Sequence, residues 1–307
     1  MAEPTDYYTS RYSGEEIDNL LDIVKNGGGG GGDFADRKLS NLDTPQEALA
    51  NLGAGVRPNL GDNCDFTAPI NQRGVTSWSI PSGDVPVFDR WKIQATEGSV
   101  EANLESGGLK LSMDAINQGI KQTYQGGYLL PQKVYTSSVI VDGRLYSAEI
   151  VPEEGTGMVV QYPGTEFSCA ITFNGGACQW YPYIDYRSGS RTVTIARCKL
   201  ENDRGQTLGY MDADGTWKLL PQPESDYATQ LRRCKRYYES STSSWTIPAN
   251  LTMMVPFEVE KRIVPTVTIE NVSGGSATFD YVGTGCFRVI NPTQQPHDFR
   301  WQASAEL

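Results

Sequence analysis

The residues best suited to chemistry in this sequence form an aromatic cluster in the segment 180–186. A pyranose sugar stacks its apolar C–H face on flat rings, while its hydroxyl groups need polar side chains alongside. Gln179, Asp185 and Arg187 supply such groups next to the rings. The segment therefore predicts a sugar-binding site, although alternating aromatic residues in a strand also fill cores and subunit interfaces. The candidate ligand-binding residues are Trp180, Tyr181, Tyr183, Asp185, Tyr186 and Arg187.

No residue pattern indicates a catalytic mechanism. The single histidine, His297, lies between Pro296 and Asp298, and no G-x-S-x-G motif supplies a nucleophile. We therefore expect His297 at the surface or in an interface. Glycan cleavage could use two carboxylates at a fixed separation, and 37 acidic residues leave that alternative open. The prediction is no catalytic residue and no enzyme, with a glycan hydrolase as an alternative.

One turn resembles a calcium loop. The segment Asp212-Ala213-Asp214-Gly215 has closely spaced carboxylates, but position twelve of the loop is Pro223, where an EF-hand needs a bidentate glutamate. We predict a hairpin turn here, with a looser Ca²⁺ site as the alternative. No cofactor or metal is predicted.

The six cysteines show no metal-binding spacing, because none forms C-x-x-C and the histidine is remote. We expect buried free thiols that behave as small apolar residues. Cys169 and Cys178 flank the turn at 174–176, yet their register about a two-residue turn does not place them opposite each other. The six are Cys64, Cys169, Cys178, Cys198, Cys234 and Cys286.

The elements that must position these residues are short apolar runs separated by Gly, Pro, Asn and Asp. This spacing predicts a mainly β fold, an antiparallel sandwich or jelly roll over 58–222. A helix over Ser225–Tyr238 and a small C-terminal β region complete the segment 223–307. The expected strands are Val85–Ile93, Leu109–Met113, Tyr135–Val141, Leu145–Val151, Met158–Tyr162, Phe167–Phe173, Thr192–Leu200, Val264–Ile269, Ala277–Val282 and Cys286–Ile290.

The segment 1–57 predicts two short helices joined by a glycine tether at 27–32. Ser13 with Glu16, and Thr44 with Glu47, form capping boxes at their starts. Neither apolar stripe is large enough to form a core within one chain, so we expect an oligomeric bundle, with packing against the large domain as the alternative. The predicted oligomerisation and attachment residues are Ile17, Leu20, Leu21, Val24, Leu49 and Leu52.

The net charge of −11 argues against nucleic acid as a partner, because phosphate binding needs a basic face. The one basic cluster, 232–236, lies in the predicted helix 225–238. The sequence contains no run of about 18 apolar residues, the length that a membrane-spanning helix needs. The amino-terminal residues show neither the basic nor the apolar region of a secretory signal, so we expect synthesis in the cytoplasm.

The segment KLSNLDTPQEALANLG (38–53) resembles a leucine- and asparagine-rich motif of phage tail-fibre proteins. The segment YSGEEIDNLLD (12–22) is similar to the first helix of fibre proteins of phages and prophages from gut Firmicutes. NLGDN (59–63), PINQRG (69–74) and DRW (89–91) are similar to the start of a carbohydrate-binding-module-like jelly roll. Two later stretches fit the same class, ARCKLE (196–201) and YATQLRRCKRYY (227–238).

This resemblance implies a structural protein of the virion, assembled in the bacterial host cytoplasm. It implies a homotrimer that contacts other virion proteins of the baseplate, tail or capsid through its amino-terminal region. The β-rich head would bind a host surface glycan or receptor. Two alternatives remain: a capsid head fibre or decoration protein, and a glycan-degrading tail enzyme.

Overall fold

The computed structural model describes residues 56–174, 176–212, 214–220, 222, 226–273 and 277–306. The fold is mainly β, and every strand pair in the described residues is antiparallel, which confirms the fold class predicted at that level. The predicted helices of the segment 1–57, with the stripe residues Ile17 to Leu52, lie outside the described residues.

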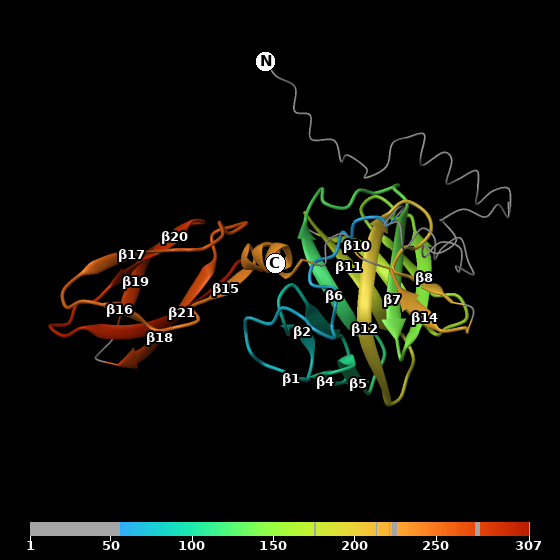
Figure 1. The fold of residues 1–307 in the computed structure, drawn as a ribbon, viewed down its shortest axis with the longest axis horizontal. Coiled ribbons are helices and arrows are strands. Elements are labelled where there is room, and N and C mark those ends of the chain that lie inside the picture. Colours follow the sequence, from blue (N-terminus) through green and yellow to red (C-terminus); the bar gives the residue numbers. More distant parts are fainter. Residues whose placement is uncertain are drawn as a thin grey trace, which may run out of the picture.

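Two six-stranded sheets form the larger part of the molecule (Figure 1). The first sheet contains, in spatial order, β1 (Ser77–Ile80), β4 (Val100–Glu105), β5 (Gly108–Met113), β12 (Arg191–Asn202), β7 (Tyr135–Val141) and β8 (Arg144–Ile150). The second contains β2 (Gly83–Pro86), β3 (Lys92–Ala95), β6 (Gln118–Gln125), β11 (Ala177–Asp185), β10 (Phe167–Asn174) and β9 (Met158–Gln161).

Apolar side chains from both sheets form one core between them. In β5, Leu109, Leu111 and Met113 point inward at every second position, as expected for a strand with one buried face. Trp91 and Trp180 pack against each other in this core, with ring centroids 5.8 Å apart. The hairpin of β13 (Gly209–Met211) and β14 (Trp217–Leu219) covers part of the first sheet's outer face through Leu208 and Trp217.

A second, smaller pair of sheets follows the helix α3 (Tyr227–Lys235). The longest strand of this part, β21, buries His297, Phe299, Trp301 and Ala303 in alternation. Its core is separate from that of the first sandwich. One sheet contains β15 (Tyr238–Ser240), β16 (Trp245–Ile247), β18 (Thr266–Ser273) and β21 (His297–Ser304). The other contains β17 (Thr252–Pro256), β20 (Cys286–Ile290) and β19 (Thr278–Val282).

Two predicted elements differ from the structure. The expected strand Val85–Ile93 is a hairpin, because the chain turns between β2 and β3, where Trp91 N–H donates to Phe88 O at 3.0 Å. Arg90 in this turn has φ of 74°, which no strand residue adopts. The helix is shorter than 225–238: Asp226 caps it by accepting from Thr229 N, and Tyr238 already belongs to β15.

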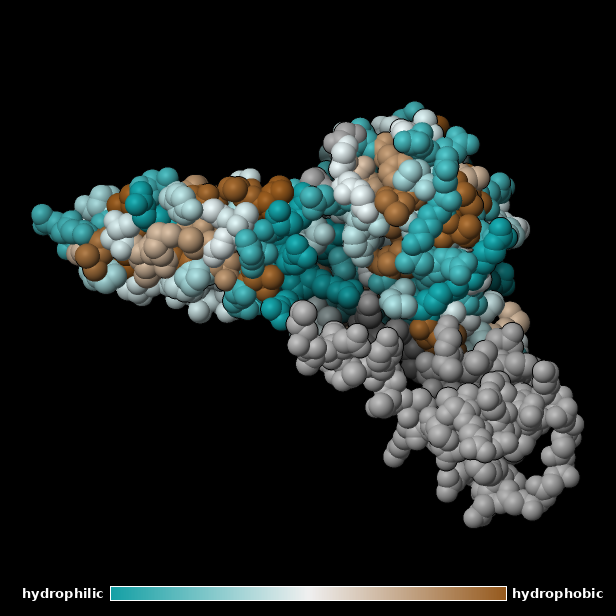
Figure 2. All heavy atoms as spheres, turned by 90° about the horizontal axis from the view of Figure 1, so that it is seen from above, coloured by the Kyte–Doolittle hydropathy of each residue, from teal (hydrophilic) through white to brown (hydrophobic). Residues whose placement is uncertain are grey.

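The two sandwiches meet at a polar junction beside α3 (Figure 1). Arg73 of the first sandwich forms an ion pair with Glu306 at 2.9 Å, and its guanidinium lies 3.8 Å above the Tyr238 ring. Gln72 donates to the Tyr238 carbonyl at 2.9 Å. Hydrophilic residues gather in this region in the view of Figure 2. These contacts join the second sandwich to the first.

Candidate functional site

The predicted sugar-binding residues lie on and just beyond β11, and a β-bulge divides them between two faces. The pairing of β11 with β6 shifts between Trp180 and Tyr183, so these residues, three apart, both point into the core. The strands approach closely here, since a Cβ on Gly119 of β6 would lie 2.3 Å from the Tyr183 carbonyl oxygen.

Trp180 and Tyr183 cannot form a sugar platform, because both side chains are fully buried between the sheets. Trp180 Nε1 donates to Ser137 Oγ at 3.0 Å, and the Tyr183 hydroxyl donates to Asp185 Oδ2 at 2.8 Å. The prediction for these two rings is therefore wrong, and the alternative, a core position, applies. The displaced register at the bulge is the physical reason.

Asp185 is also buried, and two arginines hold it. Arg187 Nη2 lies 2.7 Å and Arg191 Nε 2.6 Å from Asp185 Oδ2. Burial alone would raise the pKa of this carboxyl, but the hydrogen bonds from Arg187, Tyr183 and Arg191 outweigh burial and lower the pKa to about 2. Asp185 is thus charged at neutral pH and anchors the end of β11 through its arginine partners. It does not face solvent as a sugar ligand or a general acid.

Two of the predicted residues, Tyr181 and Tyr186, lie near each other at the outer face of the second sheet, where Tyr181 is only 7% exposed. Tyr181 packs with Ala170 and Ile184 on that face. Tyr186 follows two residues after Ile184 and is 42% exposed. Burial, and then the neighbouring Tyr181, raise the pKa of Tyr186. Both phenols are therefore neutral near pH 7 and able to donate and accept hydrogen bonds.

Polar side chains from three further positions surround Tyr181. The Tyr181 hydroxyl lies 2.7 Å from Gln179 Oε1 and 3.0 Å from Gln94 Oε1. Lys121 Nζ donates to Gln94 Oε1 at 3.2 Å and to the Tyr181 hydroxyl at 3.3 Å, and forms an ion pair with Asp84 at 2.6 Å. These residues come from β2, β3, β6 and β11, which are adjacent in the sheet. We call Tyr181, Tyr186, Gln94, Gln179 and Lys121 the tyrosine face.

Gln94 and Lys121 were not among the predicted site residues. A signal for them exists in the sequence, because Lys92 and Gln94 alternate with the buried Ile93, and Lys121 follows the buried Ile120. Alternation shows that a side chain points outward, but it does not show which outward side chains of different strands become neighbours. That information requires the strand order.

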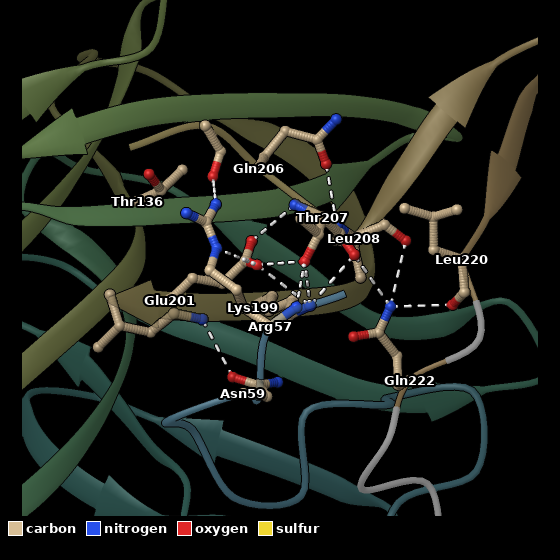
Figure 3. A network of polar contacts seen from close by, with 12 residues as sticks. Arg57, Asn59, Thr136, Lys199, Glu201, Gln206, Thr207, Leu208, Leu220 and Gln222 are labelled. Carbon is tan, nitrogen blue, oxygen red and sulfur yellow. Dashed lines mark hydrogen bonds and ion pairs between the residues drawn. The ribbon is translucent and has the colours of Figure 1, made fainter. Parts of the chain in front are cut away.

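The outer face of the other sheet carries a different polar cluster, whose contacts are drawn in Figure 3. Lys199 and Glu201 of β12 are fully buried 3.2 Å apart. Lys199 donates to Thr207 Oγ1 at 2.7 Å, Thr207 N–H donates to Glu201 at 2.8 Å, and Arg57 lies 3.4 Å from Glu201. This network joins residues 56–66, which we call the entry segment, and the loop that contains Thr207 to the sheet, so its role is structural.

The other residues considered for catalysis or metal binding, His297 and Asp212, make structural hydrogen bonds. His297 is fully buried with Nε2 2.7 Å from Asn271 Oδ1, so its predicted surface position is wrong. Asp212 closes the predicted hairpin turn, where its Oδ1 accepts from Asp214 N and Thr216 N. No group of three or more metal-ligating side chains occurs in the described residues.

The basic cluster of α3 faces acidic neighbours. Arg233 lies 3.7 Å from Asp62, and Lys235 forms an ion pair with Glu258. Two of the four cationic side chains in this cluster are therefore balanced by carboxylates. Within the part of the chain that the structure describes, no helix has the length and apolar character needed to cross a membrane.

Comparisons with known proteins do not add a family or a relative to this picture. No family model matches the sequence, and neither the curated proteins nor the solved structures contain a match.

Proposed function

We propose that this chain is a non-enzymatic, trimeric fibre protein of a bacteriophage particle, whose jelly-roll head binds a host surface glycan through the tyrosine face. The supporting observation is that Tyr181 and Tyr186 share one outer sheet face with Gln94, Gln179 and Lys121. The amino-terminal segment 1–57 attaches the trimer to baseplate, tail or capsid proteins. A capsid head fibre has the same architecture and differs only in its docking partner.

The chemistry of the tyrosine face favours a sugar over other ligands. An exposed phenol ring supplies a flat surface for the C–H face of a pyranose. The two amides and the neutral hydroxyls can donate and accept, as sugar hydroxyls require. The buried Lys121 ammonium is bonded to Asp84, Gln94 and the Tyr181 hydroxyl, so it orients these groups. The charge of Lys121 is balanced by Asp84 at 2.6 Å, so the face has no strong preference for anions.

The carboxyl groups near the tyrosine face support a binding role without catalysis. A glycosidase needs two carboxyl groups that reach the scissile bond. Asp185, the carboxylate within the aromatic segment 180–186, is buried and held by Arg187 and Arg191. Asp84, at the edge of the tyrosine face, is engaged with Lys121. Neither group is placed to exchange protons with a bound sugar.

Binding of the purified protein to host cell-wall and surface glycans tests the proposal. Tyr186→Ala should weaken binding about two- to tenfold, because loss of one stacking ring costs roughly 0.5–1.5 kcal/mol and 1.4 kcal/mol corresponds to a factor of ten. Tyr281→Ala is the matched control, since Tyr281 is 51% exposed but lies on the second sandwich. Titration by calorimetry or a glycan array gives the affinities.

Three outcomes would contradict the proposal. Equal affinities for Tyr186→Ala and wild type would remove the tyrosine face from the interaction. No binding of wild type to any host envelope glycan would reject the receptor-binding role. Release of soluble sugar from the envelope, abolished by Asp185→Asn, would show an enzyme instead.

A further inference from the structure

Cys64 and Cys198 lie opposite each other where the entry segment pairs with β12. An isolated antiparallel bridge joins Asp65 to Arg197, so the next residue pair along these two segments is Cys64 and Cys198. Cys198 N–H donates to the Cys64 carbonyl at 3.1 Å. Hydrogen-bonded antiparallel pairs have Cα atoms ~5.5 Å apart. Disulfides most often join Cα atoms separated by ~5.5–6 Å.

The two side chains share the same surroundings. Cys198 belongs to the main core, and Cys64 packs against that core from its edge. Cys198 Sγ lies 4.0 Å from the Cys64 carbonyl oxygen. Burial raises the pKa of the Cys198 thiol well above its usual value, and the adjacent Cys64 thiol raises that pKa further. The two sulfur atoms are therefore close enough to influence each other.

A cavity gives access to this pair. It has a volume of about 310 Å³, and both cysteines line it together with Asn59, Ile70 and Tyr227. Cys64 is partly exposed, whereas Cys198 is 1% exposed. A small thiol reagent entering from solvent meets Cys64 first, and Cys198 is positioned to react second.

We propose that Cys64 and Cys198 are a disulfide-forming pair, with Cys64 the sulfur that reacts with an external disulfide and Cys198 the resolving sulfur. With glutathione disulfide as oxidant, the Cys64 thiolate attacks one glutathione sulfur and releases one glutathione. Cys198 then loses its proton and attacks Cys64 Sγ, which releases the second glutathione. Two protein thiols are oxidised and one glutathione disulfide is reduced to two glutathiones.

The product would tie the entry segment to the central strand β12. That segment is the first described part of the chain, so the bond would reinforce the point where the chain enters the first sandwich. A disulfide that closes so long a loop stabilises mainly by restricting the unfolded chain. The inference does not depend on sugar binding.

The other four cysteines are placed differently. Cys169 lies opposite Val160 on β9, and Cys178 lies opposite Phe173 on β10. Cys234 is buried on α3, and Cys286 is on β20 of the second sandwich. All six are free thiols in the structure. Cys286 is the second partly exposed thiol, so it provides a matched control.

The experiment treats the full-length Cys286→Ser protein with glutathione disulfide and measures intact mass and linked peptides. The expected result is loss of two hydrogen atoms, a Cys64–Cys198 peptide, and a rise of several degrees in Tm. In the same background, Cys198→Ser should retain one glutathione on Cys64, and Cys64→Ser should take up none. The Cys286→Ser change itself should leave the linkage unaltered relative to wild type.

Two outcomes would overturn the inference. The first is an unchanged mass after oxidation, with Cys64 and Cys198 both alkylated once the protein is denatured. The second is a linkage between any other pair of cysteines. If a serine variant is unstable, the peptide map of the oxidised wild type still decides between these outcomes.

Discussion

At the scale of single residues, the junction holds a carboxyl group with an unusual titration. Asp89 is fully buried, and one of its oxygens accepts from Gln72 N–H at 2.9 Å. The other oxygen, Oδ1, has no hydrogen-bond partner within the described part of the chain. Burial raises the pKa of Asp89 to about 6, against the opposing effects of the Gln72 hydrogen bond and Arg73. Folding therefore favours the protonated form of this side chain.

The pH dependence of stability follows from that shift. The pKa of Asp89 in the folded protein lies above the unfolded value of 3.8. Its contribution to the free energy of unfolding is therefore fully present below pH 3.8 and is lost as pH rises through 6. The loss is on the order of 3 kcal/mol by pH 8. Asp89→Asn should therefore be more stable than wild type at pH 8 and equally stable near pH 4, measured by urea unfolding.

Asp280→Asn provides a control of opposite sign. The Asp280 pKa is lowered by the hydrogen bond from Arg288, so this variant should lose stability at pH 8 relative to wild type but not at acid pH. An Asp89→Asn effect that is the same at pH 4 and pH 8 would contradict the assignment of the raised pKa.

At the scale of one element, β12 carries charge on a face that later parts of the chain cover. Lys199 and Glu201 point outward from the sheet core, yet both are fully buried under Arg57 and the segment that contains Thr207. Side chains of β12 alternate between the two faces of the sheet as in any strand. Lys199 and Glu201 are buried only because other segments cover the outer face. A buried ion pair of this kind depends on both partners and on its hydrogen bonds.

Removal of one partner tests this arrangement. Glu201→Gln should lower the free energy of unfolding by ~3–5 kcal/mol, because Lys199 and Arg57 would lose their compensating carboxylate in a buried site. Glu105→Gln is the control, since Glu105 and Lys110 form an exposed pair 3.2 Å apart, where the expected loss is only ~0–1 kcal/mol. Equal effects of the two changes in urea unfolding would show that the β12 pair is solvated.

At the scale of the whole molecule, two sandwiches with separate cores are joined by a short polar junction. The chain returns to this junction at Glu306, so the second sandwich is held at both of its ends. Two β modules in series are compatible with the fibre proposed above. The proposed trimer depends on the segment 1–57, which lies mostly outside the described residues.

The predicted trimer has a direct test in that segment. Replacing Leu20 and Leu21 by Asp should reduce the mass in light scattering from trimer to monomer, because the charged residues would disrupt the apolar stripe that subunits share. Deleting two glycines from the run 27–32 should leave both mass and head folding unchanged, since the run contributes no packed surface. An unchanged mass for the Asp variant would reject the bundling role.

The sequence by itself determined the fold class and many of the strands. Cys286–Ile290 matches β20 and Tyr135–Val141 matches β7, because burial of one or both faces leaves a local pattern of apolar residues bounded by turn signals. The same local signal placed the helix, although Asp226 and Tyr238 moved its ends inward.

Only the tertiary structure decided which residues share a surface. The bulge in β11 turns Trp180 and Tyr183 into the core and leaves Tyr181 and Tyr186 outside, and its position depends on how β6 pairs with β11. Gln94 and Lys121 join the tyrosine face, and Cys64 faces Cys198, through pairings between remote segments. Periodicity reports whether a side chain points inward or outward, whereas strand order and register determine its neighbours.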